Sequence, residues 1–273
     1  ELKRLKNIPV NERKDLLNRK SDHINWSRKL ERFAVNDIEL EFHQSHLKLS
    51  LYRPFTKKWV YHDKALNEEA RLYYNKFGQN NLVINTTGRG TTRYFSPLVV
   101  DCIPSNDFME KGQGFMRYDN EIDETSLFQN NDNMNQEFAN KLGLNLDDTF
   151  AYVYGLLNSK EYQEKYANDL KKDLARIPIA QNKERYVEVG RALMDLHLNY
   201  EEVPVYDGGE ITPFVNPSYK VTKMRFAKKR DEKGKSVNDL STIIFNSDIT
   251  ISNIPEKAYE YVVNGRSAIE WII

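Results

Sequence analysis

The stretch "FAYVYGLLNSKEYQEKYANDLKKDLARIPIA", residues 150–180, carries the strongest helical pattern of this sequence and decides its fold class. Its first apolar stripe follows one face of a helix and comprises Phe150, Val153, Tyr154 and Leu157. Asp147 is a candidate N-cap for this helix, because a side-chain oxygen ahead of an apolar run can accept a free backbone N–H. The pattern predicts a helical second half.

Further helices are predicted on both sides of this stripe. A second stripe, ended by Pro178, comprises Tyr162, Tyr166, Leu170 and Leu174. A third stripe comprises Tyr186, Val189, Leu193 and Leu196. Residues 11–34 and 254–273 are also helical in pattern; Asn264-Gly265 resembles a helix stop, and Ser267 with Glu270 has the spacing of a capping box.

Strand patterns dominate the rest of the chain. Apolar residues alternate over 38–42 and, on the opposite parity, over 47–51, which predicts a hairpin turning near Gln44–Ser45. The stretch "YRPFTKKWVYHD", residues 52–63, continues as a strand whose Tyr52, Phe55 and Trp59 are predicted to anchor a sheet. Four further strand patterns are "NNLVINTTGRG" (80–90), "FSPLVVDCIP" (95–104), "YKVTKMRF" (219–226) and "STIIFNSDITISN" (241–253). We therefore predict an α+β fold, in which a mostly antiparallel sheet region packs with a helical region.

Composition narrows the class of protein without identifying a partner. The chain has 273 residues, of which 40% are hydrophobic and 29% charged, as in a folded globular protein. Its only cysteine, Cys102, excludes an internal disulfide and argues against a cysteine-based zinc site. No stretch approaches the ~20 apolar residues of a membrane-spanning helix, so we expect no membrane partner.

The formal net charge of zero conceals charged blocks of both signs. Residues 220–235 carry eight Lys or Arg against two Asp or Glu, and residues 48–64 carry five against one. Residues 119–148 carry eight acidic residues against one basic residue and look like a long loop. Such blocks can create a strongly positive face on a neutral protein, although each alone is typical of a solvated surface.

Motifs for catalysis are weak. The loop "TTGRGTT", residues 86–92, has a GxG but lacks the third glycine and the following helix of a nucleotide-binding fingerprint, so a glycine-rich turn is the favoured interpretation. His43 and His46 supply only two potential zinc ligands, and surface histidines are the simpler interpretation. Cys102 lies in an apolar strand, where a free thiol behaves as a small buried hydrophobe.

Binding chemistry is better supported, because Lys and Arg neutralise phosphates and Arg, Asn and Gln can read base edges. The candidate DNA-binding residues lie in three segments. The stretch 52–63 contributes Lys57 and Lys58, and the loop "NTTGRGTTR", residues 85–93, contributes Asn85, Arg89, Thr91, Thr92 and Arg93. The basic segment 220–230 contributes Lys220, Lys223, Arg225, Lys228, Lys229 and Arg230. We expect these cations to line a single cleft wide enough for a duplex.

A series of motifs then identifies a family resemblance. "YRPF", the stretch 150–180, "GRALMDLHLNYE" and "ISNIPEKAYEYVVNGRSAIEWI" occur in this order. The series resembles the C-terminal specificity region of single-polypeptide Type I-like restriction–modification enzymes, the type ISP family. The resemblance covers roughly residues 40–273, and the chain is expected to be a piece of a longer protein.

The resemblance implies a parent in which a nuclease and a DNA-translocating ATPase precede an adenine-N6 methyltransferase. Residues 1–40 would be a helical linker from that methyltransferase, and 41–273 a target-recognition domain with two sub-lobes divided near 119–146. Its partners would be double-stranded DNA and the methyltransferase domain, in the cytoplasm of a bacterium. No cofactor is expected in this chain, whereas S-adenosylmethionine, ATP and Mg²⁺ are expected for the parent.

The function predicted from the sequence is therefore sequence-specific recognition of duplex DNA, without catalysis by this chain itself. Two alternatives stay open at this point. The chain could contain its own methyltransferase or nuclease site, which binding of S-adenosylmethionine or Mg²⁺-dependent cleavage would reveal. It could also be a protein–protein docking module, whose binding need not weaken steeply with salt as DNA binding does.

Overall fold

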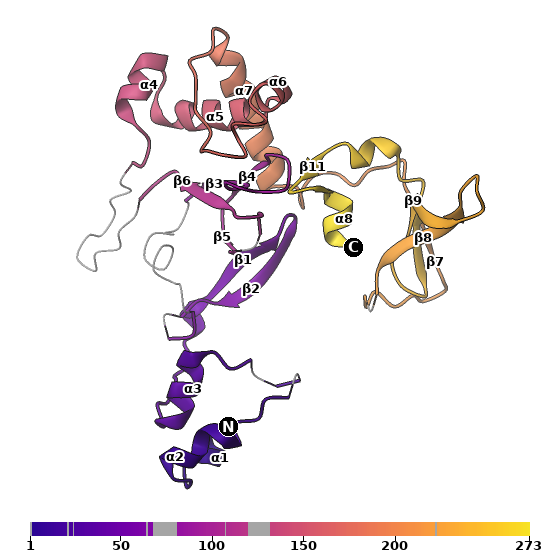
Figure 1. Ribbon diagram of the computed structural model, residues 1–273. Coiled ribbons are helices and arrows are strands. Elements are labelled where there is room, and N and C mark those ends of the chain that lie inside the picture. The colour runs from indigo at the N-terminus through magenta and orange to yellow at the C-terminus, as the bar shows by residue number, and fades with distance from the viewer. Residues whose placement is uncertain are drawn as a thin grey trace.

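The computed structural model describes residues 2–20, 22–23, 25–63, 65–67, 81–106, 108–119, 132–221 and 223–273. These residues form an α+β structure, as predicted, with helices on one side of a central sheet and three further sheets (Figure 1). The strands pair antiparallel except where Ile103–Pro104 pairs parallel with its neighbour. No helix among the described residues has the length and apolar character needed to span a membrane.

The N-terminal helices form a small cluster of their own, drawn in indigo at the bottom of Figure 1. The helices are α1 (Leu2–Leu5), α2 (Val10–Arg13), the 3-10 helix η1 (Lys14–Leu16) and α3 (Arg28–Val35). The buried Arg13 guanidinium donates to the backbone carbonyls of Lys6, Ile8 and Val35, which ties the segments together. The predicted helix over 11–34 is thus broken, and only its two ends are α-helical.

The first hairpin turns later than predicted. It consists of β1 (Leu47–Arg53) and β2 (Thr56–Tyr61), and β5 (Ile103–Pro104) pairs parallel with β1. The turn is at Pro54 and Phe55, where Pro54 lacks the N–H needed to continue the ladder and Phe55 takes a positive φ of 59°. The predicted turn at Gln44–Ser45 is wrong, because these residues begin a 3-10 helix, η2 (Gln44–His46).

The central sheet has the strand order β4-β3-β6. Its strands are β3 (Val83–Thr86), β4 (Pro97–Val100) and β6 (Gln113–Met116). Every residue of β3 and β4 is buried, because both faces are covered. Ile84 and Val99 face the helices, whereas Val83, Leu98 and Val100 pack in a second cluster with Leu51 of β1.

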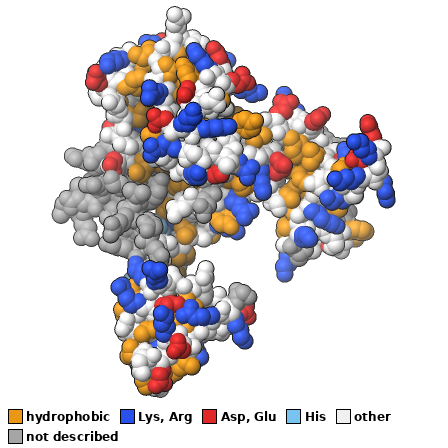
Figure 2. Space-filling model, viewed as in Figure 1, with side chains coloured by type: hydrophobic (Ala, Val, Ile, Leu, Met, Phe, Trp, Pro, Cys, Tyr) orange, Lys and Arg blue, Asp and Glu red, His pale blue; other side chains and the backbone are white. Residues whose placement is uncertain are grey.

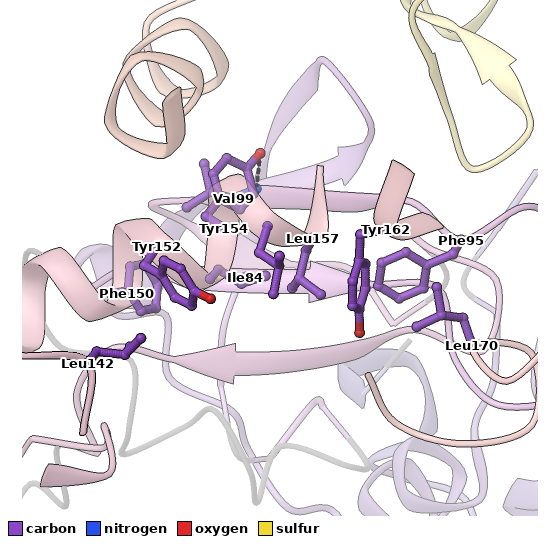
Figure 3. Packing of buried hydrophobic residues seen from close by; sticks show 11 residues of the cluster. Ile84, Phe95, Val99, Leu142, Phe150, Tyr152, Tyr154, Leu157, Tyr162 and Leu170 are labelled. Carbon is purple, nitrogen blue, oxygen red and sulfur yellow. Dashed lines mark hydrogen bonds between the residues drawn. The ribbon is translucent and has the colours of Figure 1, made fainter. Parts of the chain in front are cut away.

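The helical layer packs on the first of these faces (Figure 3). It consists of α4 (Gln136–Leu142), α5 (Leu146–Leu157), α6 (Lys160–Lys165) and α7 (Lys183–Leu198). The hydroxyl of the buried Tyr154 accepts a hydrogen bond of 3.1 Å from Val99 N, which joins α5 to β4. Buried tyrosines of this kind satisfy backbone groups that the sheet leaves unpaired.

Two details of the helical prediction are wrong. The N-cap of α5 is Asn145, whose side chain accepts from Asp148 N at 2.8 Å, so Asp147 lies inside the first turn. The second helix ends at Lys165, and Leu170 packs into the core from a run of turns instead. The turn conformation is stabilised because the Tyr162 hydroxyl donates to Arg176 O at 2.7 Å and draws the chain back.

A separate C-terminal lobe holds a four-stranded antiparallel sheet of order β7-β10-β9-β8, drawn in orange at the right of Figure 1. The strands are β7 (Glu210–Pro213), β8 (Arg225–Arg230), β9 (Ser236–Ile244) and β10 (Ile249–Ser252). The predicted strand over 219–226 overlaps β8 only at Arg225 and Phe226, and the predicted strand over 241–253 is divided by a turn into the end of β9 and β10. Thr222 and part of the predicted sub-lobe boundary at 119–146, namely residues 120–131, lie outside the described residues.

The chain finally returns from this lobe to the central sheet. After the 3-10 helix η3 (Glu256–Tyr259) come β11 (Val262–Val263), β12 (Arg266–Ser267) and α8 (Ala268–Ile272). The predicted capping box of Ser267 and Glu270 is confirmed. Asn264-Gly265 is not a helix stop but the turn of a hairpin, because both residues take the positive φ, 49° and 81°, that a tight primed turn requires.

Candidate nucleic-acid interface

The loop between β3 and β4, residues 87–96, is held close to a second turn at residues 108–112. Gly88 N donates to Glu110 O at 3.0 Å. A Cβ at Gly88 would lie 1.6 Å from the carbonyl oxygen of Lys111, so only glycine allows this approach. The glycine-rich turn predicted for this segment thus serves close backbone packing between two loops.

The carboxylate of Glu110 accepts hydrogen bonds from the tip of this β3–β4 loop. Its carboxylate accepts from Thr91 Oγ1 at 2.6 Å, from Thr92 Oγ1 at 3.0 Å, and from the backbone N–H groups of Thr92 and Arg93 at 3.0 and 3.1 Å. The hydrogen bond from the Thr91 hydroxyl, with those from Thr92 and Arg93, lowers the pKa of Glu110 to about 2. The carboxylate is therefore ionised at neutral pH and organises the loop.

Cations surround the loop on the surface. Lys111 Nζ donates to Gly90 O at 2.6 Å, and Gly90 N donates to Lys171 O at 2.7 Å. Lys171 Nζ lies 5.7 Å from the ring centroid of the exposed Tyr94. Arg89 and Arg93 are exposed, and within the described part of the chain neither forms an ion pair. The tip is thus held by hydrogen bonds and is positively charged.

Predicted residues of this segment differ in accessibility. Arg89, Thr92 and Arg93 are exposed, as a binding role requires. The placement of Asn85 on the loop is wrong, because Asn85 lies within β3, is 4% exposed and donates to Val83 O. Thr91 is 6% exposed and bound to Glu110, so its hydroxyl supports the loop and is not presented at the surface.

The basic segment 220–230 lies on the C-terminal lobe. Lys220 and Lys223 are exposed ahead of β8, and Arg225 is exposed where β8 begins. Along β8, Lys228 Nζ donates to Asn238 Oδ1 at 2.6 Å, Lys229 pairs with Asp239 at 3.7 Å, and Arg230 donates to Gly234 O at 3.1 Å. Because β8 is an edge strand, these cations also protect the edge against pairing with other chains.

The predicted residues of the hairpin β1–β2 agree with the structure only in part. Lys57 already has partners within the chain, because its Nζ lies 3.6 Å from the Glu201 carboxylate and 5.3 Å from the Tyr200 ring centroid. Lys58 is exposed, with Nζ 4.2 Å from the ring centroid of Tyr52. The prediction that Trp59 anchors a sheet is wrong, because its side chain is 71% exposed. Trp59 pairs with Leu49, which is itself 37% exposed, so this end of the hairpin is not covered as Leu51 is.

The three basic segments lie on different parts of the structure. The β3–β4 loop belongs to the central sheet, Lys58 to the hairpin β1–β2, and the basic segment to the C-terminal lobe (Figure 1). Figure 2 shows an open recess bordered by the N-terminal helices, the sheets and the C-terminal lobe, with Lys and Arg side chains on the surfaces around it. A shared binding surface across this recess stays a prediction.

His43 and His46, which are close in the sequence, form a polar cluster with Asp63. His46 Nδ1 lies 2.6 Å from Asp63 Oδ2, and the rings of His43 and His46 are 5.0 Å apart. Among the described residues, no group of three or more potential ligands is arranged to hold a metal ion. Cys102 is buried, as predicted, and burial raises its pKa to about 11, so the thiol stays protonated at neutral pH.

A family model described as the Type ISP C-terminal specificity domain matches residues 1–273. The chain belongs to this family. A comparison of this specificity domain with curated proteins gave no match.

Solved structures agree with this assignment. A nuclease-deletion mutant of the Type ISP restriction-modification enzyme LlaGI in complex with a DNA substrate mimic is 41% identical, with a TM-score of 0.77; the match covers 100% of this chain and 21% of that chain. The ATP-dependent Type ISP restriction-modification enzyme LlaBIII bound to DNA is 35% identical, with a TM-score of 0.79 and coverages of 97% and 18%. A DrdV–DNA complex is 26% identical, with a TM-score of 0.81 and coverages of 99% and 27%. The specificity domain thus spans about a fifth of the LlaGI and LlaBIII chains.

Sequence reasoning missed three residues that the structure places at the β3–β4 loop of the specificity domain. Glu110, Lys111 and Lys171 follow the loop by about 20 to 80 positions in the chain. The only local signal was a charged pair in front of Gly112, which is common in ordinary turns. Their role becomes visible only when the two turns are brought together.

Proposed function

We propose that this specificity domain recognises a specific sequence in double-stranded DNA for a restriction–modification enzyme. It positions the target adenine for N6-methylation by a methyltransferase domain of the same polypeptide. The proposal depends chiefly on the β3–β4 loop, whose exposed Arg89 and Arg93 have no ion-pair partner among the described residues. It is supported by the two relatives at 41% and 35% identity, which are solved with a DNA substrate mimic and with DNA.

The proposed chemistry divides the basic residues by role. An arginine on a rigid loop can form two parallel hydrogen bonds to O6 and N7 of guanine in the major groove, which distinguishes base pairs. Lysines on an edge strand such as β8 act as point charges that neutralise phosphates and set the register of the protein on the duplex. We therefore assign base reading to the β3–β4 loop and phosphate binding to the C-terminal lobe.

The parent enzyme supplies the catalysis in this proposal. The specificity domain is the non-catalytic part, while other domains bind S-adenosylmethionine for methylation and ATP with Mg²⁺ for translocation and cleavage. Adenine-N6 chemistry requires the base to leave the helical stack, so a recognition domain must hold the duplex while the base is flipped. The enzyme acts in the bacterial cytoplasm, where its DNA substrate is found.

The proposal is tested with the full-length enzyme and two short duplexes. One duplex carries the adenine motif that the enzyme methylates in its host, and the other carries the same bases scrambled. Affinity for both should fall with salt, with a log–log slope of about −0.9 per phosphate contacted, and the motif duplex should bind more tightly. Equal affinity for the two duplexes, or S-adenosylmethionine binding by residues 1–273 alone, would contradict the proposal.

Arg89→Ala or Arg93→Ala is expected to reduce discrimination between the two duplexes by about 1–3 kcal/mol, because a bidentate base contact is lost. Competition binding measures the effect. Arg185→Ala is the matched control, because Arg185 is an exposed arginine of α7 that pairs with Glu188 at 2.7 Å. Equal losses on both duplexes would make the substituted arginine a phosphate contact.

Lys228→Ala is expected to weaken binding to the motif and scrambled duplexes equally and to reduce the magnitude of the salt slope by about 1. The reason is that a phosphate contact carries no base information. Lys141→Ala on α4, where Lys141 pairs with Glu137, should leave the slope unchanged. A change in discrimination for Lys228→Ala would assign this lysine to base reading.

A further inference from the structure

We propose that Glu110 is a specificity-determining positioning residue, which holds the β3–β4 loop in the conformation that presents Arg89 and Arg93 to the duplex. This inference depends on the function proposed above and adds to it the residue through which base reading is organised. Glu110 does not contact DNA in this proposal and acts through the loop.

The first support is the number and kind of donors on one carboxylate. Two hydroxyls, of Thr91 and Thr92, and two backbone N–H groups, of Thr92 and Arg93, all donate to Glu110. Backbone donors fix the path of the chain, because they cannot rotate away as side chains do. Ordering the loop before binding removes an entropic loss that a mobile loop would suffer when it meets DNA.

The second support is that Glu110 is itself held by a distant part of the chain. Its backbone N–H donates to Asn264 Oδ1 at 3.1 Å, and Asn264 N donates to Ser96 Oγ at 3.1 Å. Asn264 is buried at the turn of the β11–β12 hairpin, and a Cβ at the neighbouring Gly265 would lie 2.8 Å from Arg93 Cδ. The C-terminal hairpin thus clamps the β3–β4 loop and Glu110 together.

Charge and geometry argue against direct base reading by Glu110. A glutamate can accept a hydrogen bond from N4 of cytosine, but both Glu110 oxygens already accept from the loop. A carboxylate also repels phosphates unless nearby donors neutralise it, as the hydroxyls and N–H groups do here. In this proposal the carboxylate holds the loop in place, and the exposed arginines contact the DNA.

The test uses the full-length enzyme with Glu110→Gln, Glu110→Asp and the matched control Glu137→Gln. Glu137 is an exposed acid of α4 that pairs with Lys141 at 2.8 Å, so its substitution removes the same charge without touching the loop. The probes are the duplex that carries the host-methylated adenine motif and its scrambled version. Thermal melting and amide hydrogen exchange at Thr92 and Arg93 are measured on each variant.

We expect Glu110→Gln to lower discrimination between the duplexes about tenfold, because an amide oxygen cannot replace a carboxylate that accepts from several donors. Binding to the scrambled duplex and the melting temperature should match those of Glu137→Gln, while exchange at Thr92 and Arg93 should accelerate. Glu110→Asp keeps the charge and should restore part of the discrimination.

The possible outcomes of this test lead to different conclusions. If the wild-type enzyme does not discriminate between the duplexes, the proposed function itself fails. If the wild type discriminates and Glu110→Gln discriminates equally well, this inference is overturned while the function stands. A parallel loss on both duplexes with a lower melting temperature would show a purely structural role and would also overturn it.

Discussion

Gly190→Val is expected to lower the free energy of unfolding by about 4 kcal/mol or more, the largest effect of any substitution considered. The reason is the crossing of α5 and α7. A Cβ at Gly190 would lie 1.9 Å from Ala151 O, and one at Gly155 would lie 2.2 Å from Tyr186 O. Both clashes are with backbone, so no side-chain rotation relieves them.

The helices cannot move apart without losing the core. α5 carries Tyr152 and Tyr154, which are fully buried, and Tyr154 is also bonded to Val99 of the central sheet. Moving α7 outward by the width of a methyl group would open a void along this interface, where close packing supplies much of the stability. Two glycines facing each other are therefore a requirement of the crossing.

Urea unfolding and thermal melting of the chain measure this effect. Ala192→Val is the matched control, because Ala192 lies on the exposed face of the same helix and the change introduces the same β-branched side chain. The control should lose only the helix-propensity difference, about 0.6 kcal/mol. Equal losses for Gly190→Val and Ala192→Val would show that the crossing tolerates a side chain.

Acidification from about pH 6.5 to pH 4 is expected to destabilise the chain through His197 by about 3 kcal/mol. Burial lowers the pKa of His197 to about 4, because the interior disfavours the imidazolium form. Since the unfolded histidine titrates near 6.5, the neutral folded form is fully favoured above that pH. This stabilisation is lost as the pH falls toward the folded pKa.

The surroundings of His197 explain why its neutral form is built into the fold. Its Nδ1 lies within hydrogen-bond distance, 2.5 Å, of the Tyr154 hydroxyl, which also accepts from Val99 N. The His197 ring also stacks on Tyr261 with centroids 5.2 Å apart. Protonation would place a positive charge in this largely buried contact between α7 and α5, where burial disfavours the imidazolium form.

Urea midpoints between pH 7.5 and pH 4 check this prediction in the wild type and in His197→Gln. The variant should be less stable at neutral pH and should lose less stability on acidification, because glutamine does not titrate. His23→Gln is the control, because His23 is exposed on the N-terminal segment and should leave the pH dependence unchanged. Parallel curves for the wild type and His197→Gln would rule out His197 as the source.

The fold class and several local features followed from the sequence, whereas element bounds did not. Apolar spacing located α5 and α7, and the Ser267–Glu270 spacing located the capping box of α8. The second stripe, ending at Leu174, has helical spacing, yet α6 ends at Lys165 because tertiary hydrogen bonds favour turns there. Local propensity is a weak signal where a long-range contact opposes it.

The candidate site was predictable only in part. The exposure of Arg89 and Arg93 agreed with a glycine-containing loop, and Lys228, Lys229 and Arg230 are exposed, as a basic binding segment requires. Asn85 was misplaced because the sequence does not show where a buried strand ends and its loop begins. Lys57 has a partner at Glu201, and nothing in the spacing of these residues indicates that they meet.

By itself, the sequence determined the α+β class, the main helices and strands, and the resemblance to the type ISP specificity region, because periodicity and motif order are local properties of a chain. Only the tertiary structure decided that Glu110, Asn264 and the β3–β4 loop form one unit, and that Gly155 faces Gly190 across a helix crossing. Those contacts join positions far apart in the chain, and their geometry depends on how the layers pack. Packing is a property of the whole chain, which no single segment encodes.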